Sequence, residues 1–345
     1  MFETSETCFI LFTLPSMRSD PLLRDLQARG LLPPAQAQAI RHDEQKRPFS
    51  LHQELRAALY LGVTLLAGGL GVLLYQHFNE LGFLTIIVGT VLLMTGSFTY
   101  AVLRRQPFTW GQATAVSYVH DYLLLLSCLL FLALETYLQV QFNLFGTRYG
   151  LATLVPAVLF FGLAYRFDHR GVLAMGITAL ASWVGVSVAP LSAFTDTHYL
   201  RSLGVAAVLL GVALAGAGLY SDLANRKRHF AFTYLSLGAN LALLALLGAM
   251  FGYYHSSFLP PVLAALLVVL LSAGLVWVAR RTQSYLFLLL GVLYGYVAIT
   301  YLCMRVLLTA ASSDGAITLA ILYFTLSAAG AIQLFLHGKE FLRRV

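Results

Sequence analysis

Residues 81–103 read LGFLTIIVGTVLLMTGSFTYAVL and contain no charged side chain. A helix needs about 20 such residues to cross the hydrocarbon core of a bilayer, which is about 30 Å thick. The sequence has nine further long apolar runs, of which only the run at 115–134 contains a charged residue, Asp121. They are at residues 57–75, 115–134, 150–165, 171–191, 203–220, 230–251, 258–278, 285–303 and 316–336. The pattern predicts an all-α, polytopic integral membrane protein with about ten transmembrane helices.

Composition supports this class of protein and argues against others. Of the 345 residues, 59% are hydrophobic and 11% charged, and the mean hydropathy is +0.77, which is too apolar for a soluble domain. The net charge is +7, but the basic residues are spread over several loops and form no continuous stripe, so no nucleic acid is expected as a partner. The cysteines, Cys8, Cys128 and Cys303, have no paired spacing. We therefore expect no disulfide framework, no metal site and no cofactor.

The basic residues predict the orientation in the membrane. Loops rich in Lys and Arg are retained in the cytoplasm. All but three of the 22 Lys and Arg residues lie in the N-terminal segment, in alternate loops or at the C-terminus, and the exceptions are Arg148, Arg201 and Arg305. We therefore expect a multi-pass protein of the bacterial cytoplasmic (inner) membrane with both termini in the cytoplasm.

The chain is expected to have three parts. Residues 1–19 form a poorly structured N-terminal extension, residues 20–50 a short cytosolic helical hairpin, and residues 51–345 the ten-helix transmembrane domain. The apolar run at residues 8–14 is too short to span and lacks a small-residue cleavage site, so it is a poor signal peptide. Met17 is expected to be the true start; the alternative is that residues 8–14 form an interfacial anchor.

The hairpin begins at Asp20, a good helix N-cap, and Gly30 suits the position just past a helix end. A second helix is expected at about residues 34–45. A unit of fewer than about 30 residues cannot bury enough apolar surface to fold alone, so it needs a partner surface. That surface is another copy of the chain, another protein, or the cytoplasmic ends of its own spans. The expected docking residues are Leu23, Leu26, Gly30, Leu31, Leu32 and Ile40.

This N-terminal part carries a distinctive order of residues: Leu23, Leu26, Gly30-Leu31-Leu32, Gln36-Ala37 and Ala39-Ile40. A charged patch and a glycine-rich span that ends near Asn79 follow. Over about residues 20–100 this order resembles the bacterial predicted membrane proteins grouped as domain of unknown function 2157. The resemblance implies a short cytosolic helical pair before a many-helix membrane region. It implies no activity and no catalytic residues, because the family has none established.

Small residues at regular spacing predict where helices approach one another. In lipid, helices associate through small side chains rather than through the hydrophobic effect. Two spans carry glycines seven residues apart and are expected to use them as packing surfaces: Gly82, Gly89 and Gly96 in the second span, and Gly204, Gly211 and Gly218 in the sixth.

Polar residues at membrane depth are the candidate functional residues, because each costs a few kcal/mol unless it is paired or hydrated. The third span carries His120, and its Asp121, Cys128 and Glu135 share one helical stripe at seven-residue spacing. Asn240 of the seventh span is expected to converge on this stripe, together with tyrosines of the ninth and tenth spans. The alternative is structural, with Asp121 paired to Arg104 or Arg105 and Glu135 at the outer interface.

Three functions remain open. The first is a structural, assembly or docking component of the membrane that uses the hairpin. The second is a secondary transporter, because ten spans can form two inverted halves of five. The third is an intramembrane enzyme, for which the sequence offers no recognisable nucleophile, metal cluster or phosphate-binding motif. We expect the chain not to be an enzyme, and we expect lipid as its main surroundings.

Overall fold

The computed structural model describes helices and the turns between them. In chain order they are α3 (Leu51–Gln76), α4 (Phe83–Leu103), α5 (Tyr118–Phe142), α6 (Leu151–Phe167), α7 (Arg170–Val188), α8 (Thr197–Leu223), η2 (Arg228–Phe230), α9 (Ala231–Phe251), α10 (Pro261–Thr282), α11 (Tyr285–Ala310) and a last helix over Thr318–Ser327. The described residues are 27, 33, 34, 36, 38, 51–76, 83–111, 118–146, 148–188, 197–252, 258–310, 315, 318–327, 329, 330 and 333. Within them all regular structure is helical, so the all-α prediction is confirmed for this part.

Each of the ten predicted runs overlaps one of these helices. Six have the length and apolar composition needed to cross a membrane: Val119–Phe142, Arg170–Val188, Arg201–Leu223, Arg228–Phe251, Pro261–Thr282 and Tyr285–Leu307. The other four apolar helices are described over shorter lengths, and α6, with 17 residues, is only about 25 Å long. The chain is therefore a membrane protein with several apolar helices, while the number ten stays a prediction.

The N-terminal hairpin lies largely outside the described residues. Gln27, Pro34, Gln36 and Gln38 are helical, and the Gln36 N–H donates to the Pro33 carbonyl at 3.1 Å. The expected docking residues lie outside the described part of the chain, as do residues 1–19; they are Leu23, Leu26, Gly30, Leu31, Leu32 and Ile40. The three-part division of the chain therefore stays a prediction.

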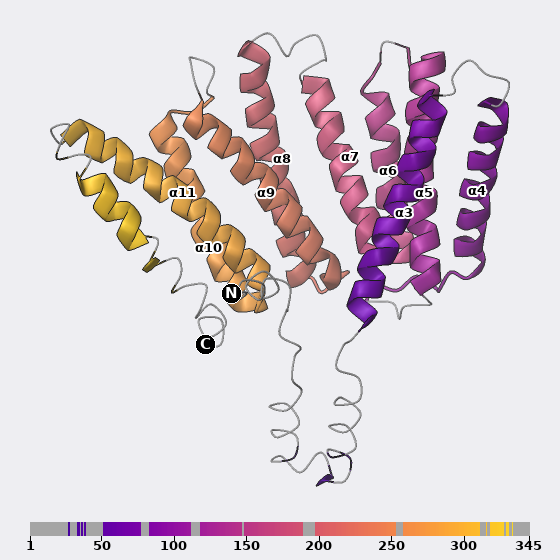
Figure 1. Ribbon diagram of the computed structural model, residues 1–345, viewed down its shortest axis with the longest axis horizontal. Helices are drawn as coiled ribbons and strands as arrows, with labels where there is room; N and C mark the ends of the chain where they lie inside the picture. Colours follow the sequence, from indigo (N-terminus) through magenta and orange to yellow (C-terminus); the bar gives the residue numbers. More distant parts are fainter. Residues whose placement is uncertain are drawn as a thin grey trace, which may run out of the picture. The chain divides into compact units, whose positions relative to one another are not determined.

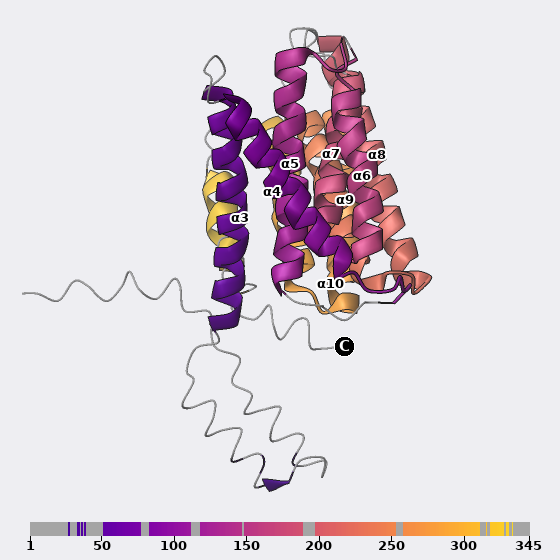
Figure 2. The same cartoon turned by 90° about the vertical axis from the view of Figure 1, so that its right-hand side faces the viewer.

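The chain forms two compact units, residues 1–69 and 70–345, and the second contains the helices from α4 onward. In this second unit the helices pack most closely in consecutive pairs: α4 with α5, α6 with α7, α8 with α9, and α10 with α11. Figures 1 and 2 both draw α6 beside α7 and α8 beside α9. Short turns join α6 to α7, α8 to α9 and α10 to α11, so the two helices of each of these pairs run antiparallel.

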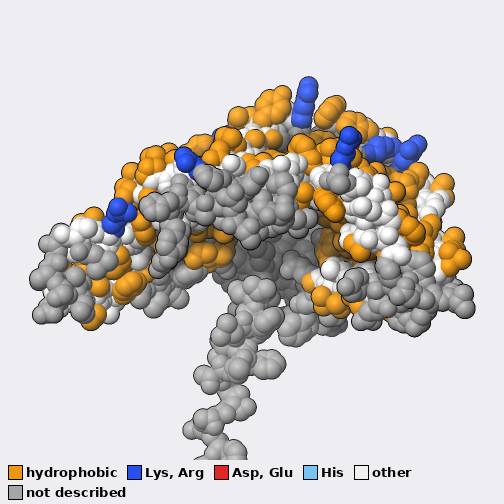
Figure 3. Space-filling model, turned by 90° about the horizontal axis from the view of Figure 1, so that it is seen from above, with side chains coloured by type: hydrophobic (Ala, Val, Ile, Leu, Met, Phe, Trp, Pro, Cys, Tyr) orange, Lys and Arg blue, Asp and Glu red, His pale blue; other side chains and the backbone are white. Residues whose placement is uncertain are grey.

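Apolar side chains lie both inside the helix assembly and on its outside. Leu243, Leu246 and Val268 are almost fully buried in a core shared by α9, α10 and α11. Leu209 and Leu270, in contrast, are 65% and 66% exposed, as expected for side chains in contact with lipid. Figure 3 shows that hydrophobic side chains make up most of the described surface on the face it presents, while Lys and Arg appear at only a few places.

Glycines bring α8 and α9 into backbone contact. A Cβ atom added to Gly211 would lie 2.6 Å from the Gly238 carbonyl oxygen and from the Ala242 nitrogen. A Cβ atom added to Gly238 would lie 2.7 Å from the Gly211 carbonyl oxygen. The other two glycines of the predicted α8 stripe also face neighbours, since Gly204 meets the ring of Phe258 and an added Cβ on Gly218 would lie 3.0 Å from the Ala231 carbonyl oxygen. The stripe thus faces α9 and the segment after it.

The glycines of α4 behave differently. A Cβ atom added to Gly89 or Gly96 would meet nothing within 4 Å among the described residues, and Gly82 lies outside them. The buried face of α4 is instead formed by Thr90, Ser97 and Ala101, of which Ala101 contacts His120 on α5. These residues can replace glycine on the packed face because Thr, Ser and Ala side chains are also small enough for close helix contact. In the described part of α4, small residues face the bundle one residue away from the predicted stripe.

We expect Gly211→Leu to lower the thermal unfolding temperature of the detergent-solubilised protein, because the new side chain would overlap the α9 backbone. Overpacking of this kind costs about 1–3 kcal/mol or more. Gly89→Leu is the matched control and should change stability by about 0.5 kcal/mol at most, as is typical of an open surface position. Equal losses in the two variants would contradict the assignment of Gly211 as a close contact.

Candidate functional site

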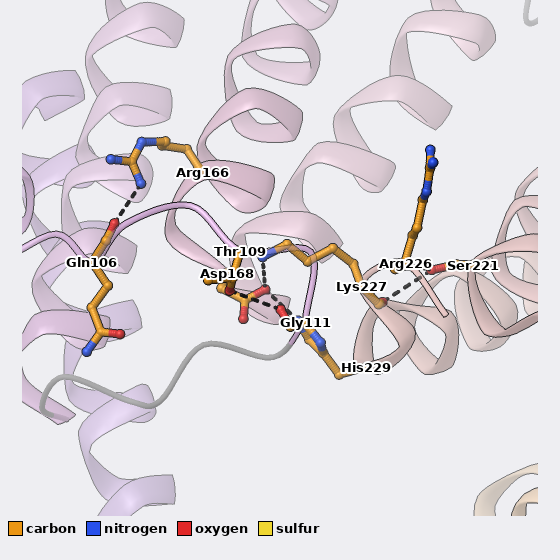
Figure 4. Close-up of polar contacts among 9 residues, drawn as sticks. All are labelled: Gln106, Thr109, Gly111, Arg166, Asp168, Ser221, Arg226, Lys227 and His229. Atoms are coloured by element: carbon orange, nitrogen blue, oxygen red, sulfur yellow. Dashed lines mark hydrogen bonds and ion pairs between the residues drawn. The ribbon is translucent and has the colours of Figure 1, made fainter. Parts of the chain in front are cut away.

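Three turns meet at one end of the helices, and together they form a region with several buried polar and charged side chains. They are the segment after α4 at residues 104–111, the α6–α7 turn at Asp168 and His169, and the α8–α9 turn at residues 224–230. Figure 4 shows that side chains from the second and third turns point toward one another. We call the group formed by Asp168, Lys227 and His229 the turn cluster.

The α6–α7 turn places a carboxylate at the centre of this cluster. Asp168 ends α6 in the left-handed conformation, with φ 59° and ψ 36°, which Asp tolerates better than most residues. The following N–H, of His169, donates to the Ala164 carbonyl at 3.2 Å and closes the helix end. His169 Nδ1 then accepts the Val172 N–H at 3.1 Å, so its ring begins α7 in the way an N-cap side chain does. This conformation points the Asp168 side chain toward the α8–α9 turn.

The α8–α9 turn brings Lys227 into the interior. Lys227 also has a positive φ of 50°, and its side chain is only 2% exposed. The Lys227 ammonium donates to Asp168 Oδ1 at 2.7 Å, and the backbone N–H of Lys227 donates to the Trp110 carbonyl at 2.8 Å. The Ser221 hydroxyl donates to the carbonyl of Arg226 at 2.6 Å and fixes the preceding peptide. One lysine therefore joins all three turns.

The second partner of the carboxylate is His229. Its Nε2 lies 2.6 Å from the same Asp168 Oδ1, and its side chain is 6% exposed. Lys227 Nζ also lies 5.2 Å from the centre of the Phe108 ring, which gives the ammonium a further favourable contact. A buried charge is tolerated only when it is paired and hydrogen-bonded. The Lys227 ammonium and the Asp168 carboxylate meet this condition in each other. His229 Nε2 lies close to the same carboxylate but forms no hydrogen bond within the described part of the chain.

The segment after α4 is held over this cluster by its backbone. Arg166 Nη1 donates to the Gln106 carbonyl at 2.9 Å, and the Trp110 carbonyl accepts the Lys227 N–H already described. The Arg226 guanidinium lies 5.2 Å from the centre of the Trp110 ring. These ion pairs and hydrogen bonds hold the three turns in fixed positions relative to one another. No group of three or more His, Cys, Asp or Glu residues in the described part could hold a metal ion.

The polar residues predicted on α5 lie in different environments. His120 is buried and its Nε2 is 3.1 Å from the Ala101 carbonyl oxygen, while its Nδ1 is 3.3 Å from Asp121 Oδ1. Asp121 has a 30% exposed side chain and, among the described residues, forms its ion pair with His120 rather than with Arg104 or Arg105. Asp121 is thus the more exposed end of the stripe, and the stripe becomes more buried toward Cys128 and Glu135.

Cys128 and Glu135 lie farther along α5. Cys128 is 2% exposed and Glu135 7% exposed. The Glu135 Oε1 atom has no hydrogen-bond partner in the described part of the chain. Glu135 is thus buried among helices, and its place at the outer interface, the alternative given above, stays a prediction. Whether this stripe carries a function stays a prediction.

The structure does not bring Asn240 to this stripe. Asn240 Nδ2 donates to the Ser236 carbonyl at 2.8 Å, and Asn240 Oδ1 accepts the Tyr294 hydroxyl at 3.0 Å. Other polar groups also pair between helices, as in Thr300 with Tyr323 at 2.7 Å. These groups satisfy one another across α9, α11 and the last helix, and α5 has its own polar residues.

Sequence reasoning missed the turn cluster. Lys227 lies between Arg226 and Arg228 in a basic loop, and Asp168 lies next to His169 in another, so neither position in the sequence predicts an inward-facing pair. The sequence offers one signal for the turn cluster, which is the small number of acidic residues in the basic loops. Between the apolar runs on the basic side, Asp168 and Asp222 are the only acids, so each was bound to meet a base.

Comparison with known proteins shows a similarity to one family over part of the chain. The model of the family "Predicted membrane protein (DUF2157)" matches residues 24–173. This match confirms the resemblance seen in the N-terminal part and extends it to the start of α7. Neither the comparison with curated proteins nor that with solved structures gives a match. The family match covers α3 to α6, Asp168 and His169, whereas Lys227 and His229 lie beyond it.

We expect Lys227→Met to destabilise the protein by about 3–5 kcal/mol, because it leaves the Asp168 carboxylate buried with less compensation. The double variant Lys227→Met/Asp168→Asn should recover part of this loss. Arg228→Gln is the matched control: Arg228 pairs with Asp222 at 2.7 Å but is 71% exposed, and such pairs contribute about 0–1 kcal/mol. Thermal unfolding in detergent measures all three. A double variant no more stable than Lys227→Met alone would contradict a direct Lys227–Asp168 interaction.

Proposed function

We propose that this chain is a structural, assembly or docking component of the bacterial inner membrane. The observation that carries the proposal is the turn cluster, in which the 2.7 Å Lys227–Asp168 pair ties three turns into one fixed end. A fixed, ordered end suits a platform on which another molecule is held. The cytosolic hairpin at residues 20–50 is proposed as the docking element, with another protein or a second copy of the chain as its partner.

The proposed orientation has both termini in the cytoplasm and ten spans. Its support is the distribution of charge: the basic turns after α4, α6 and α8 lie at one end, and Arg148, in the α5–α6 turn, follows a helix that runs the other way. Lys and Arg are retained on the cytoplasmic side, so the end that carries the turn cluster is assigned to the cytoplasm.

Cysteine labelling tests the orientation. In a chain whose native cysteines are replaced by alanine, Gln36→Cys should react with a membrane-impermeant maleimide in inverted membrane vesicles and stay unlabelled in intact cells. Arg148→Cys, also exposed, is the matched control and should show the reverse. Labelling of both positions from the same side would contradict the proposed topology.

The same exposed segment tests docking. A photo-crosslinker at Gln38 should give one defined product in native membranes, with the mass of a second copy or of one other protein. A crosslinker at Tyr149, which is 49% exposed in the α5–α6 turn, is the control and should give none. Products confined to this chain's own spans would contradict docking and make the hairpin part of the membrane fold.

Glu135 favours a second candidate, a secondary transporter. A carboxyl group within an apolar helix costs a few kcal/mol unless it is paired or hydrated, and such residues often mark ion or proton pathways. In two inverted halves of five spans, the pair α4–α5 would correspond to α9–α10. The pair α6–α7 would correspond to α11 and the last helix. The most closely packed pairs of the later helices are instead α8–α9 and α10–α11. This pairing gives the inverted-halves arrangement no support, so the transporter ranks second.

We expect Glu135→Met to raise the thermal unfolding temperature, since an unsatisfied buried acceptor costs about 1–3 kcal/mol. A transport role predicts that this more stable variant also loses proton or cation flux in reconstituted vesicles. Ser127→Ala on the same helix is the control; the Ser127 hydroxyl donates to the Leu124 carbonyl at 2.7 Å, so its removal should not stabilise. Absence of flux in the unaltered protein would end the transporter candidate.

A further inference from the structure

Four arginines belong to, or contact, the segment at residues 104–111. Arg104 and Arg105 begin it, Arg166 donates to its Gln106 carbonyl at 2.9 Å, and Arg226 lies 5.2 Å from the ring of Trp110. Residues 104–111 themselves contain no acidic side chain. Positive charge is therefore concentrated around one short segment at the end of an apolar helix.

The carboxylates near this segment already have basic partners. Asp168 is held by Lys227 and His229, and Asp222 accepts Arg228 at 2.7 Å. Among the described residues, the four arginines around residues 104–111 form no ion pair. Arg104 and Arg226 lie instead over the aromatic rings of Tyr100 and Trp110. The excess positive charge of these arginines is therefore not neutralised by the described residues, and it can attract a bound anion.

Two exposed aromatic side chains accompany this charge. Phe108 is 46% exposed and Trp110 53% exposed, and their rings pack edge to face at 5.1 Å. Trp side chains favour the boundary between hydrocarbon and headgroups. The segment follows α4 directly, so its aromatic rings and arginines are placed at the end of an apolar helix, where headgroups are found.

We propose that residues 104–111 and Arg226 bind the headgroup of an anionic phospholipid. Planar guanidinium groups bind phosphate oxygens through paired hydrogen bonds, and basic pockets at the ends of transmembrane helices are suited to such headgroups. The Lys227–Trp110 and Arg166–Gln106 hydrogen bonds hold the segment in place before a lipid arrives, so little ordering accompanies binding. This site requires insertion in the membrane but does not depend on docking.

Lipid-dependent thermal unfolding of the full chain tests the proposal. In an uncharged detergent, phosphatidylglycerol should raise the unfolding temperature and phosphatidylcholine should not. Arg105→Gln/Arg226→Gln should need about 30-fold more phosphatidylglycerol for half of the shift. Arg148→Gln/Arg201→Gln is the matched control, because both arginines are exposed and lie outside the basic turns; it should respond as the unaltered protein does.

Arg105→Gln alone serves as a second variant, because Arg105 makes no side-chain hydrogen bond or ion pair with another described residue and its loss should leave folding intact. It should also weaken the response to phosphatidylglycerol. Equal weakening in the control pair would assign the effect to overall charge and overturn the site. An equal shift with phosphatidylcholine or with inorganic phosphate alone would also overturn it.

Discussion

The close approach of α8 and α9 at Gly211 and Gly238 is the contact on which the described helix arrangement depends. Lipid supplies no hydrophobic driving force between helices, so small residues and polar contacts must hold them. Once α9 lies against α8, its Tyr234 hydroxyl reaches that of Tyr165 on α6 at 3.1 Å, and its Asn240 bonds Tyr294 on α11. The helix α9 thus links three others, and a change at the glycine contact would shift each of these polar pairs.

The turn cluster depends on the same contact. The α8–α9 turn is short, so the separation of the two helices sets where Lys227 can reach. A buried ion pair contributes little net stability compared with apolar packing, because both charges lose their water. Its effect is selective: an unpaired Lys227 or Asp168 would be costly, so arrangements in which the α6–α7 and α8–α9 turns do not meet are disfavoured. The pair specifies which turns lie together.

Sequence patterns predicted the helices and one packing face, but they could not identify the inward charges. Seven-residue spacing of glycine identified the packing face of α8 at Gly211 but not that of α4, where Gly89 and Gly96 have the same spacing and no close neighbour among the described residues. The face of α4 was missed by one residue because Thr90 and Ser97 repeat at the same spacing as Gly89 and Gly96, and Ser or Thr serves close packing as well as Gly. Lys227 points inward because its backbone is left-handed, and nothing in a run of three basic residues indicates which one turns inward.

The two carboxyl groups of the α5 stripe are too far apart to act as one proton-transfer unit. Asp121 and Glu135 are fourteen residues apart, which is about 21 Å along the helix, and their directions differ by about 40° because 3.6 residues per turn do not divide seven evenly. A proton cannot pass that far in one step. Asp121 is also partly exposed and paired with His120, whereas Glu135 is buried with an unsatisfied oxygen. Glu135 therefore lies in an environment separate from that of Asp121, and any proton route to it would have to be supplied by the helices packed against α5.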